Sequence, residues 1–249
     1  MSKVINKCEV CNNNNLEEVL SLGLHPLCDD LIDIETNFSS KLFPIEILLC
    51  KKCITAHQKH QVDKQKLFPT TYHYRSRLTN DVLLGMDNLV DSVELLKGSL
   101  NDLTILDIGC NDGSLLDRFH NKGAKTIGIE PTGAYKDVDD NKHIVINDFF
   151  TKSVAQSVLK IHRKIDVITF TNVFAHIEDL PSLLSALEIL VNDETIIVIE
   201  NHYLGAVLEK NQFDTFYHEH PRTYSLKSFI NIANTIDCNI MDLHFPKRY

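Results

Sequence analysis

Hydrophobic positions in the second half of the chain follow two patterns that alternate. Short apolar runs predict strands, and segments in which apolar residues recur every three or four positions predict helices. The runs that predict strands lie at 103–108, 125–130, 143–146, 166–171 and 195–200, and the helical patterns lie at about 81–98, 114–121, 151–162 and 179–191. This alternation favours a parallel sheet with helices on both faces, which is a doubly wound α/β domain.

The first part of the chain lacks this alternation, and we expect a small loop-rich module over residues 1–75, ahead of the α/β domain over 76–249. Gly23 and Pro26 interrupt residues 22–27, which predicts a turn. A locally basic stretch at 59–77 is either a solvated face or a polar wall that faces an anionic substrate. Its cationic side chains are Lys59, Lys64, Lys66, Arg75 and Arg77.

Composition places the chain among globular proteins, since 43% of its 249 residues are hydrophobic and 24% are charged. The 34 acidic and 25 basic residues give a formal charge of −9, which disfavours broad binding to nucleic acid or to an anionic membrane. The sequence has no apolar run of about 18 residues, and its start lacks the apolar core of a signal peptide. We therefore expect a cytoplasmic protein without nucleic-acid or membrane partners.

Four of the seven cysteines form two C-x-x-C pairs, Cys8 with Cys11 and Cys50 with Cys53. Two such pairs can complete the tetrahedral thiolate site that suits Zn²⁺. Asn12 follows the first pair and tolerates the left-handed backbone conformation that such turns often need. The alternatives are two unrelated buried pairs or a redox dithiol, but a redox C-x-x-C would not need a second copy. We expect a structural zinc ion that stabilises the fold.

A turn with two glycines follows the first predicted strand of the α/β domain. Its D-x-G-x-x-x-G spacing runs from Asp107 through Gly109 to Gly113, and it differs from the G-x-G-x-x-G of dinucleotide-binding folds. Asn111 occupies the position where a phosphate-binding glycine would be needed. Asp112 would repel a pyrophosphate but would tolerate a cationic sulfonium and an α-amino group. A generic βαβ turn and an NAD site are the alternatives.

The second predicted strand ends in Glu130, where a carboxylate can accept hydrogen bonds from both ribose hydroxyls. This combination resembles the S-adenosylmethionine (SAM)-dependent methyltransferases, whose first motif is an acid-x-Gly turn and whose second strand ends in an acid. The resemblance implies a Rossmann-like domain that binds SAM. It also places residues 147–149 beside adenine and residues 172–177 after the fourth strand. The implied cofactor-binding residues are Asp107, Gly109, Asn111, Gly113, Glu130, Asp148 and Asn172.

Polar and ionisable side chains gather after the fifth predicted strand, at Tyr217, His218, Glu219 and His220. A neutral imidazole can remove a proton next to a carbonyl near working pH. A neighbouring carboxylate can orient that ring, and a phenol can donate a hydrogen bond to a developing enolate. The alternatives are a metal site, for which no third ligand or H-E-x-x-H spacing is visible, and a structural histidine cluster.

Taken in order, these motifs resemble one family, the zinc-containing sugar C-methyltransferases, which methylate C3 of nucleotide-linked deoxysugars. The motifs are the two C-x-x-C pairs, the 22–26 turn, the 106–113 turn, and the 217–220 segment followed by Tyr224 and Ser225. The resemblance implies a zinc module, a SAM domain and a C-terminal α/β domain. It implies a nucleotide-linked 4-keto-6-deoxysugar as substrate, with His220 as the base that removes the C3 proton before the enolate attacks the SAM methyl. The implied supporting groups are Tyr72, His176, Tyr217 and Glu219.

The family's C-terminal domain is not represented in this sequence. We expect the chain to be a fragment, a split gene product whose separately encoded partner supplies that domain, or a shortened enzyme with another acceptor. Two other functions remain as alternatives: an O- or N-methyltransferase of a small metabolite, and a catalytically silent module that binds SAM or a nucleotide.

Overall fold

The computed structural model describes residues 3–245 except residues 30, 36 and 38. These residues form two compact units. The cysteine unit contains residues 3–67, 174–181 and 201–242, and the parallel-sheet unit contains residues 68–173, 182–200 and 243–245. The boundary predicted near residue 75 stays a prediction, and residues 246–249 of the second predicted domain lie outside the described residues.

The parallel-sheet unit is built on five parallel strands in the order β10-β9-β6-β7-β8. Each strand lies inside one of the predicted apolar runs. The order reverses on either side of β6, so the doubly wound α/β prediction is confirmed. The strands are β6 (Thr104–Ile108), β7 (Lys125–Ile129), β8 (Ile144–Ile146), β9 (Val167–Thr171) and β10 (Ile196–Glu200).

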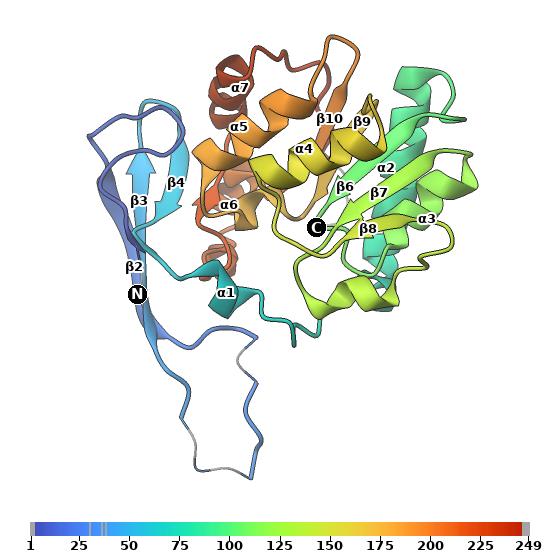
Figure 1. Cartoon of the computed structure of the whole chain (residues 1–249). Helices are drawn as coiled ribbons and strands as arrows, with labels where there is room; N and C mark the ends of the chain where they lie inside the picture. The colour runs from blue at the N-terminus through green and yellow to red at the C-terminus, as the bar shows by residue number, and fades with distance from the viewer. Residues whose placement is uncertain (1–2, 30, 36, 38, 246–249) are drawn as a thin grey trace. The chain divides into compact units, whose positions relative to one another are not determined.

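Helices cover both faces of this sheet; in Figure 1, α4 lies in front of it and α2 behind it. One apolar face of α2 is buried against side chains of β6 and α3. The helix ends at Gly98, whose φ of 79° only glycine adopts readily. No described helix combines the length and apolar content that a membrane crossing requires. The helices are α2 (Asn80–Lys97), α3 (Ser114–Asn121), α4 (Lys152–Ile161) and α5 (Leu180–Leu190), with a 3-10 turn, η2 (Gly133–Asp137).

The cysteine unit has a four-stranded antiparallel sheet in the order β11-β4-β3-β2. The expected loop-rich module therefore also contains an antiparallel sheet. The predicted turn at 22–27 is wrong in its first half, because β2 continues to His25 and Gly23 marks a shift in register instead. The strands are β2 (Glu17–His25), β3 (Phe43–Cys50), β4 (Thr55–Gln58) and β11 (Arg222–Thr223), with β1 (Lys3–Val4) paired to β5 (His60–Gln61).

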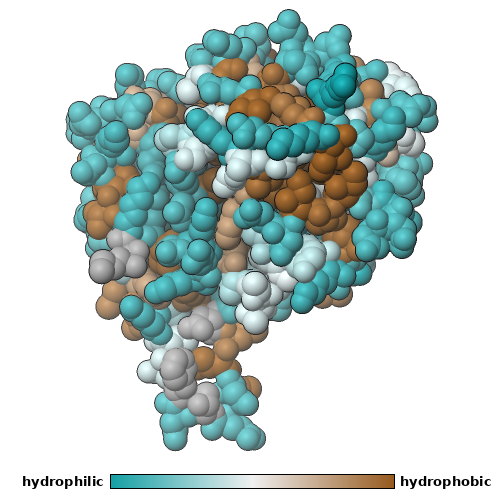
Figure 2. Space-filling model, in the orientation of Figure 1, coloured by the Kyte–Doolittle hydropathy of each residue, from teal (hydrophilic) through white to brown (hydrophobic). Residues whose placement is uncertain are grey.

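Short helices complete the cysteine unit and bury the apolar face of its sheet. Ile45 and Ile47 of β3 pack with Leu204 and Val207 of α6, which fixes the segment after β10 against the sheet. Hydrophilic side chains cover most of the face in Figure 2, as the share of charged residues predicts, and apolar patches interrupt them. The helices are α1 (Lys64–Leu67), α6 (Leu204–Glu209) and α7 (Leu226–Thr235), and the 3-10 turns are η1 (Ser76–Leu78) in the parallel-sheet unit and η3 (Phe174–His176) and η4 (Phe213–Thr215) here.

Candidate functional site

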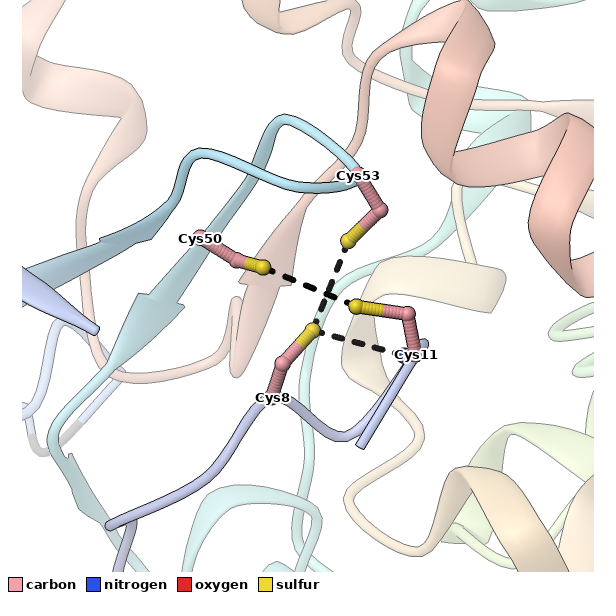
Figure 3. A group of neighbouring side chains, drawn as sticks. All are labelled: Cys8, Cys11, Cys50 and Cys53. Carbon is pink, nitrogen blue, oxygen red and sulfur yellow. Dashed lines mark hydrogen bonds between the residues drawn. The ribbon is translucent and has the colours of Figure 1, made fainter. Parts of the chain in front are cut away.

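The four paired cysteines converge in the cysteine unit, as Figure 3 shows. The Sγ atoms of Cys8 and Cys53 lie 3.4 Å apart, and those of Cys11 and Cys50 lie 3.6 Å apart. All four Sγ atoms lie within 4.8 Å of one another. A tetrahedral Zn²⁺ with Zn–S distances of about 2.3 Å would separate its sulfurs by roughly 3.8 Å. The donor set and its spacing therefore fit zinc.

Both C-x-x-C turns use the same backbone geometry. The residue after each pair, Asn12 or Ile54, donates its N–H to the carbonyl of Cys8 or Cys50, at 3.0 and 2.8 Å. Asn12 has φ 57° and Ile54 has φ 56°, so the left-handed conformation predicted at Asn12 is confirmed. The hydrogen bond with Cys53 and burial raise the pKa of the Cys8 thiol, and the same hydrogen bond lowers the pKa of Cys53 to about 5. A divalent cation would supply the counter-charge for buried thiolates.

The glycine-containing turn lies at the carboxyl end of β6 in the parallel-sheet unit. Gly109, Asn111 and Gly113 all have positive φ, at 75°, 51° and 78°. A Cβ on Gly109 would lie only 2.4 Å from Cγ2 of Val173, because the turn passes directly against the segment after β9. Position 109 therefore requires glycine both for its positive φ and for the close packing of the turn against Val173.

Two predicted cofactor-binding acids lie at the ends of neighbouring strands. Asp107 accepts a hydrogen bond from the Thr169 hydroxyl at 2.6 Å, and burial raises the pKa of its carboxyl to about 7. Glu130 accepts the backbone N–H of Asn111 at 2.9 Å and that of Thr132 at 2.8 Å, one on each oxygen. Each carboxylate oxygen has two acceptor positions, so Glu130 can still receive ribose hydroxyls.

The segment that precedes α2 covers this turn. The Asn111 side chain accepts the Ser76 N–H at 3.0 Å and donates to the Tyr74 carbonyl at 3.2 Å. Asp112 is buried and accepts two hydrogen bonds from Arg77, from Nε at 3.1 Å and from the backbone N–H at 2.9 Å. Although burial alone would raise the pKa of Asp112, its hydrogen bonds hold it below the usual value. Both side chains therefore hold the turn in place.

The remaining predicted cofactor residues lie on loops that follow β8 and β9. Asp148 is exposed and accepts the Phe149 N–H at 2.7 Å. Asn172 has φ 55°, and its N–H donates to the Glu200 carbonyl at 3.0 Å. All seven predicted cofactor residues thus lie in one unit, at or beside the carboxyl ends of its strands. Their binding role stays a prediction.

Tyr72 also lies in the parallel-sheet unit, where its carbonyl accepts Nη1 of Arg75 at 2.9 Å. Arg75 is paired with Asp137 at 2.5 Å. Carboxylates also pair with two more cations of the 59–77 stretch, as the Lys59–Glu46, Lys59–Glu18 and Arg77–Asp112 ion pairs show. These pairs favour the interpretation of that stretch as a structural, solvated face over a wall that faces an anion.

Three imidazoles and a phenol cluster in the cysteine unit. The ring of His220 lies 4.3 Å from that of Tyr217, 4.8 Å from that of His176 and 4.7 Å from that of His202, between centroids. Three of these four side chains were predicted. His202 was missed, and its one signal in the sequence is its place two residues after β10.

Backbone carbonyls set the tautomers in this cluster. Nδ1 of His220 lies 2.9 Å from the Thr215 carbonyl, and Nδ1 of His176 lies 2.9 Å from the Glu219 carbonyl. Because a carbonyl only accepts, each Nδ1 carries a proton, and in the neutral ring of His220 the Nε2 atom then has the lone pair. Burial, with the neighbouring His176 and His202, lowers the pKa of His220 well below its usual value. His220 is therefore neutral at physiological pH, which is the form that a base requires.

The Glu219 side chain is buried and contacts Cys28 and His176. Its Oε1 accepts the Cys28 thiol at 3.0 Å, and Oε2 lies 3.9 Å from Nδ1 of His176. Burial raises the pKa of Glu219 to about 7. Nε2 of His218 lies 3.2 Å from the backbone carbonyl of Phe43, and the His218 ring packs edge-on against the Phe43 ring. Residues 217–220 therefore have different surroundings. Glu219 lies near His176, and His218 packs against Phe43 of β3.

Two family models match the chain. A model described as "Methyltransferase domain" matches residues 82–243, and one described as "Putative zinc binding domain" matches residues 8–68. The C-methyltransferase NovU of Streptomyces niveus is 28% identical over 243 residues, which are 96% of this chain and 57% of the relative. This chain thus spans little more than half of the length of that protein.

Other similarities are shorter or weaker. The ubiquinone biosynthesis O-methyltransferase of Rhodopseudomonas palustris strain BisB5 is 30% identical over 104 residues, 40% of each chain. Among solved structures, magnesium protoporphyrin IX methyltransferase from Synechocystis PCC 6803, with bound SAH, is 17% identical with a TM-score of 0.46. That similarity covers 66% of this chain and 78% of the other.

Proposed function

Since the chain belongs to the SAM-dependent methyltransferase family and carries a zinc-binding domain ahead of the methyltransferase domain, we propose that it methylates C3 of a nucleotide-linked 4-keto-6-deoxysugar. The observation that carries this proposal is the neutral, buried His220, with Tyr217 and two further imidazoles around it. Similarity over almost the whole chain to a protein named as a C-methyltransferase supports methylation at carbon. The expected separately encoded C-terminal partner stays a prediction.

In the proposed complex, SAM supplies a methyl group on a cationic sulfur. Gly109 and Gly113 let the backbone approach this cofactor, and Glu130 receives its ribose hydroxyls. Asp148, which is exposed after β8, is the residue assigned to border the adenine. The zinc cluster holds four thiolates and no open position, so its contribution is to the fold and not to the reaction at C3.

Proton removal is assigned to Nε2 of His220. The 4-keto group makes the C3 proton acidic, because the electron pair left at C3 delocalises onto the carbonyl oxygen. The electron pair of the C3–H bond stays with the sugar, which becomes an enolate. The proton moves to His220, which becomes an imidazolium. Tyr217 donates a hydrogen bond to the enolate oxygen. The C3–methyl bond forms as the sulfur–methyl bond breaks, and the positive charge on the sulfur is neutralised.

The proposal is tested by supplying the protein with SAM labelled with ¹³C in the methyl group and with a nucleotide-linked 4-keto-6-deoxysugar. Product NMR should place the label on carbon. His220→Asn should abolish transfer and leave SAM affinity, measured by calorimetry, within about twofold. A labelled methyl on oxygen or nitrogen would contradict the proposal, as would SAM binding without transfer to any keto-sugar.

A further inference from the structure

Arg222 is the largest fully buried side chain among the described residues, and hydrogen bonds occupy all three of its nitrogens. Nε donates to the Tyr224 hydroxyl at 2.8 Å. Nη1 donates to a Glu9 carboxylate oxygen at 2.5 Å and to the Glu178 carbonyl at 3.0 Å, and Nη2 donates to the Ile177 carbonyl. A buried guanidinium with this many partners fixes the segments that carry them, because releasing any of them leaves a polar group unpaired.

Those partners are next to the proposed catalytic imidazoles. Ile177 and Glu178 directly follow His176, and Arg222 is two residues after His220. One guanidinium therefore ties together two segments, far apart in the sequence, whose rings lie 4.8 Å apart. The pairing of β11 with β4 holds the backbone of Arg222 itself, opposite His57.

The counter-charge of Arg222 comes from the first cysteine turn, because Glu9 lies between Cys8 and Cys11. Gln61 also donates to Glu9, at 2.8 Å, and Lys3 pairs with its outer side at 2.7 Å. The geometry of the turn that presents two sulfurs to the metal thus sets where the Arg222 guanidinium is held.

The second cysteine turn is joined to the same region. The Cys53 carbonyl accepts the hydroxyls of Ser225 and Ser228, both at 3.3 Å, and the Ile54 carbonyl accepts Ser228 at 3.0 Å. Ser225 caps α7 and follows the His220 segment. Both halves of the four-cysteine cluster therefore contact the chain just after His220.

We propose that Arg222 is a positioning residue that sets His176 against His220, and that Glu9 makes this geometry depend on the occupied cysteine cluster. The metal then governs the arrangement of the imidazoles as well as the stability of the fold. The catalytic meaning of this geometry rests on the proposed function, but the geometry itself can be measured without substrate.

The test follows the ring signals of His176 and His220 by ¹H–¹⁵N NMR, assigned with His176→Asn and His220→Asn. Arg222→Lys keeps the charge but loses the fork that reaches both carbonyls. It should shift both ring signals and lower kcat at least tenfold, with the Kd for SAM within twofold. Lys3→Ala removes only the outer partner of Glu9 and should change neither the two ring signals nor kcat. Removal of zinc from the wild-type protein should shift the same two signals in step with metal loss.

Unshifted ring signals in folded Arg222→Lys, or in zinc-depleted wild-type protein, would overturn the inference. If Arg222→Lys does not fold, Glu9→Gln replaces it, because this variant keeps Arg222 and its hydrogen bonds to the two carbonyls. Both ring signals should then shift, but by less than on zinc removal. Unshifted signals in Glu9→Gln would also overturn the proposal. If wild-type protein transfers no methyl to the keto-sugar while the ring signals respond to zinc, the proposed function fails and the positioning role stands.

Discussion

Substituting Gly109 by alanine tests how closely the turn after β6 approaches the segment after β9. Gly109 has φ 75°, and an added Cβ would lie 2.4 Å from Cγ2 and 2.8 Å from Cγ1 of Val173. The backbone conformation costs a non-glycine residue roughly 1–2 kcal/mol. Overpacking against a branched side chain adds about 1–3 kcal/mol. We therefore expect Gly109→Ala to lower the free energy of unfolding by about 2–5 kcal/mol.

Gly98 provides the matched control, because it has nearly the same φ, 79°, and a Cβ there would meet nothing within 4 Å. Gly98→Ala should therefore cost only the conformational part, about 1–2 kcal/mol. Urea denaturation of both variants, and of Gly109→Ala combined with Val173→Ala, separates the two contributions. The double variant should recover roughly 1–3 kcal/mol relative to additivity. Equal losses at Gly109 and Gly98, or additivity in the double variant, would refute the close approach.

Three further predictions concern the metal, the buried acid and the missed histidine. Metal analysis should find one zinc ion per chain, and Cys50→Ser should lose it and melt at a lower temperature; a variant that keeps zinc would contradict the four-cysteine site. Burial raises the pKa of Asp107 in the folded state to about 7, so the folded state keeps a proton that the unfolded chain releases above about pH 4. The free energy of unfolding should therefore fall as pH rises from 4 to 7, by at most about 1.4 kcal/mol per pH unit. Asp107→Asn should flatten that dependence in urea titrations at several pH values, and an unchanged slope would assign it to another group. His202→Ala should raise the pKa of His220, since it removes a neighbouring imidazole and admits water; an NMR titration in which that pKa stays the same would show that His202 does not set it.

The parallel sheet was predictable because its central strands β6, β7 and β9 are largely buried and rich in apolar residues. The helix at 114–121 has the predicted bounds, since the Gly113 turn opens it and its apolar face is short and regular. The hairpin of β2 and β3 was missed although Leu20, Leu22 and Leu24 alternate with smaller or polar residues, as in a strand. Gly23 produces a change of register inside that strand, and sequence alone does not distinguish such a bulge from a turn.

The site was predictable where residue type decides the chemistry, as with the paired cysteines. It was not predictable where the fold decides the contact. The Glu9–Arg222 ion pair joins residues 213 positions apart, and Arg222 resembles a surface cation in the sequence. For the same reason, the sequence suggests that the Glu219 carboxylate orients an imidazole, whereas in the structure the Glu219 backbone carbonyl accepts the hydrogen bond from Nδ1 of His176.

In the proposed reaction, His220 removes the C3 proton and the resulting enolate takes the methyl group. The most direct measurement uses a nucleotide-linked 4-keto-6-deoxysugar with deuterium at C3 and follows deuterium and methyl together by NMR and mass spectrometry. If His220 removes the C3 proton, every methylated product will have lost its deuterium and will carry the methyl at C3, and His220→Asn will yield neither change. A methylated product that retains deuterium at C3 would contradict this reaction.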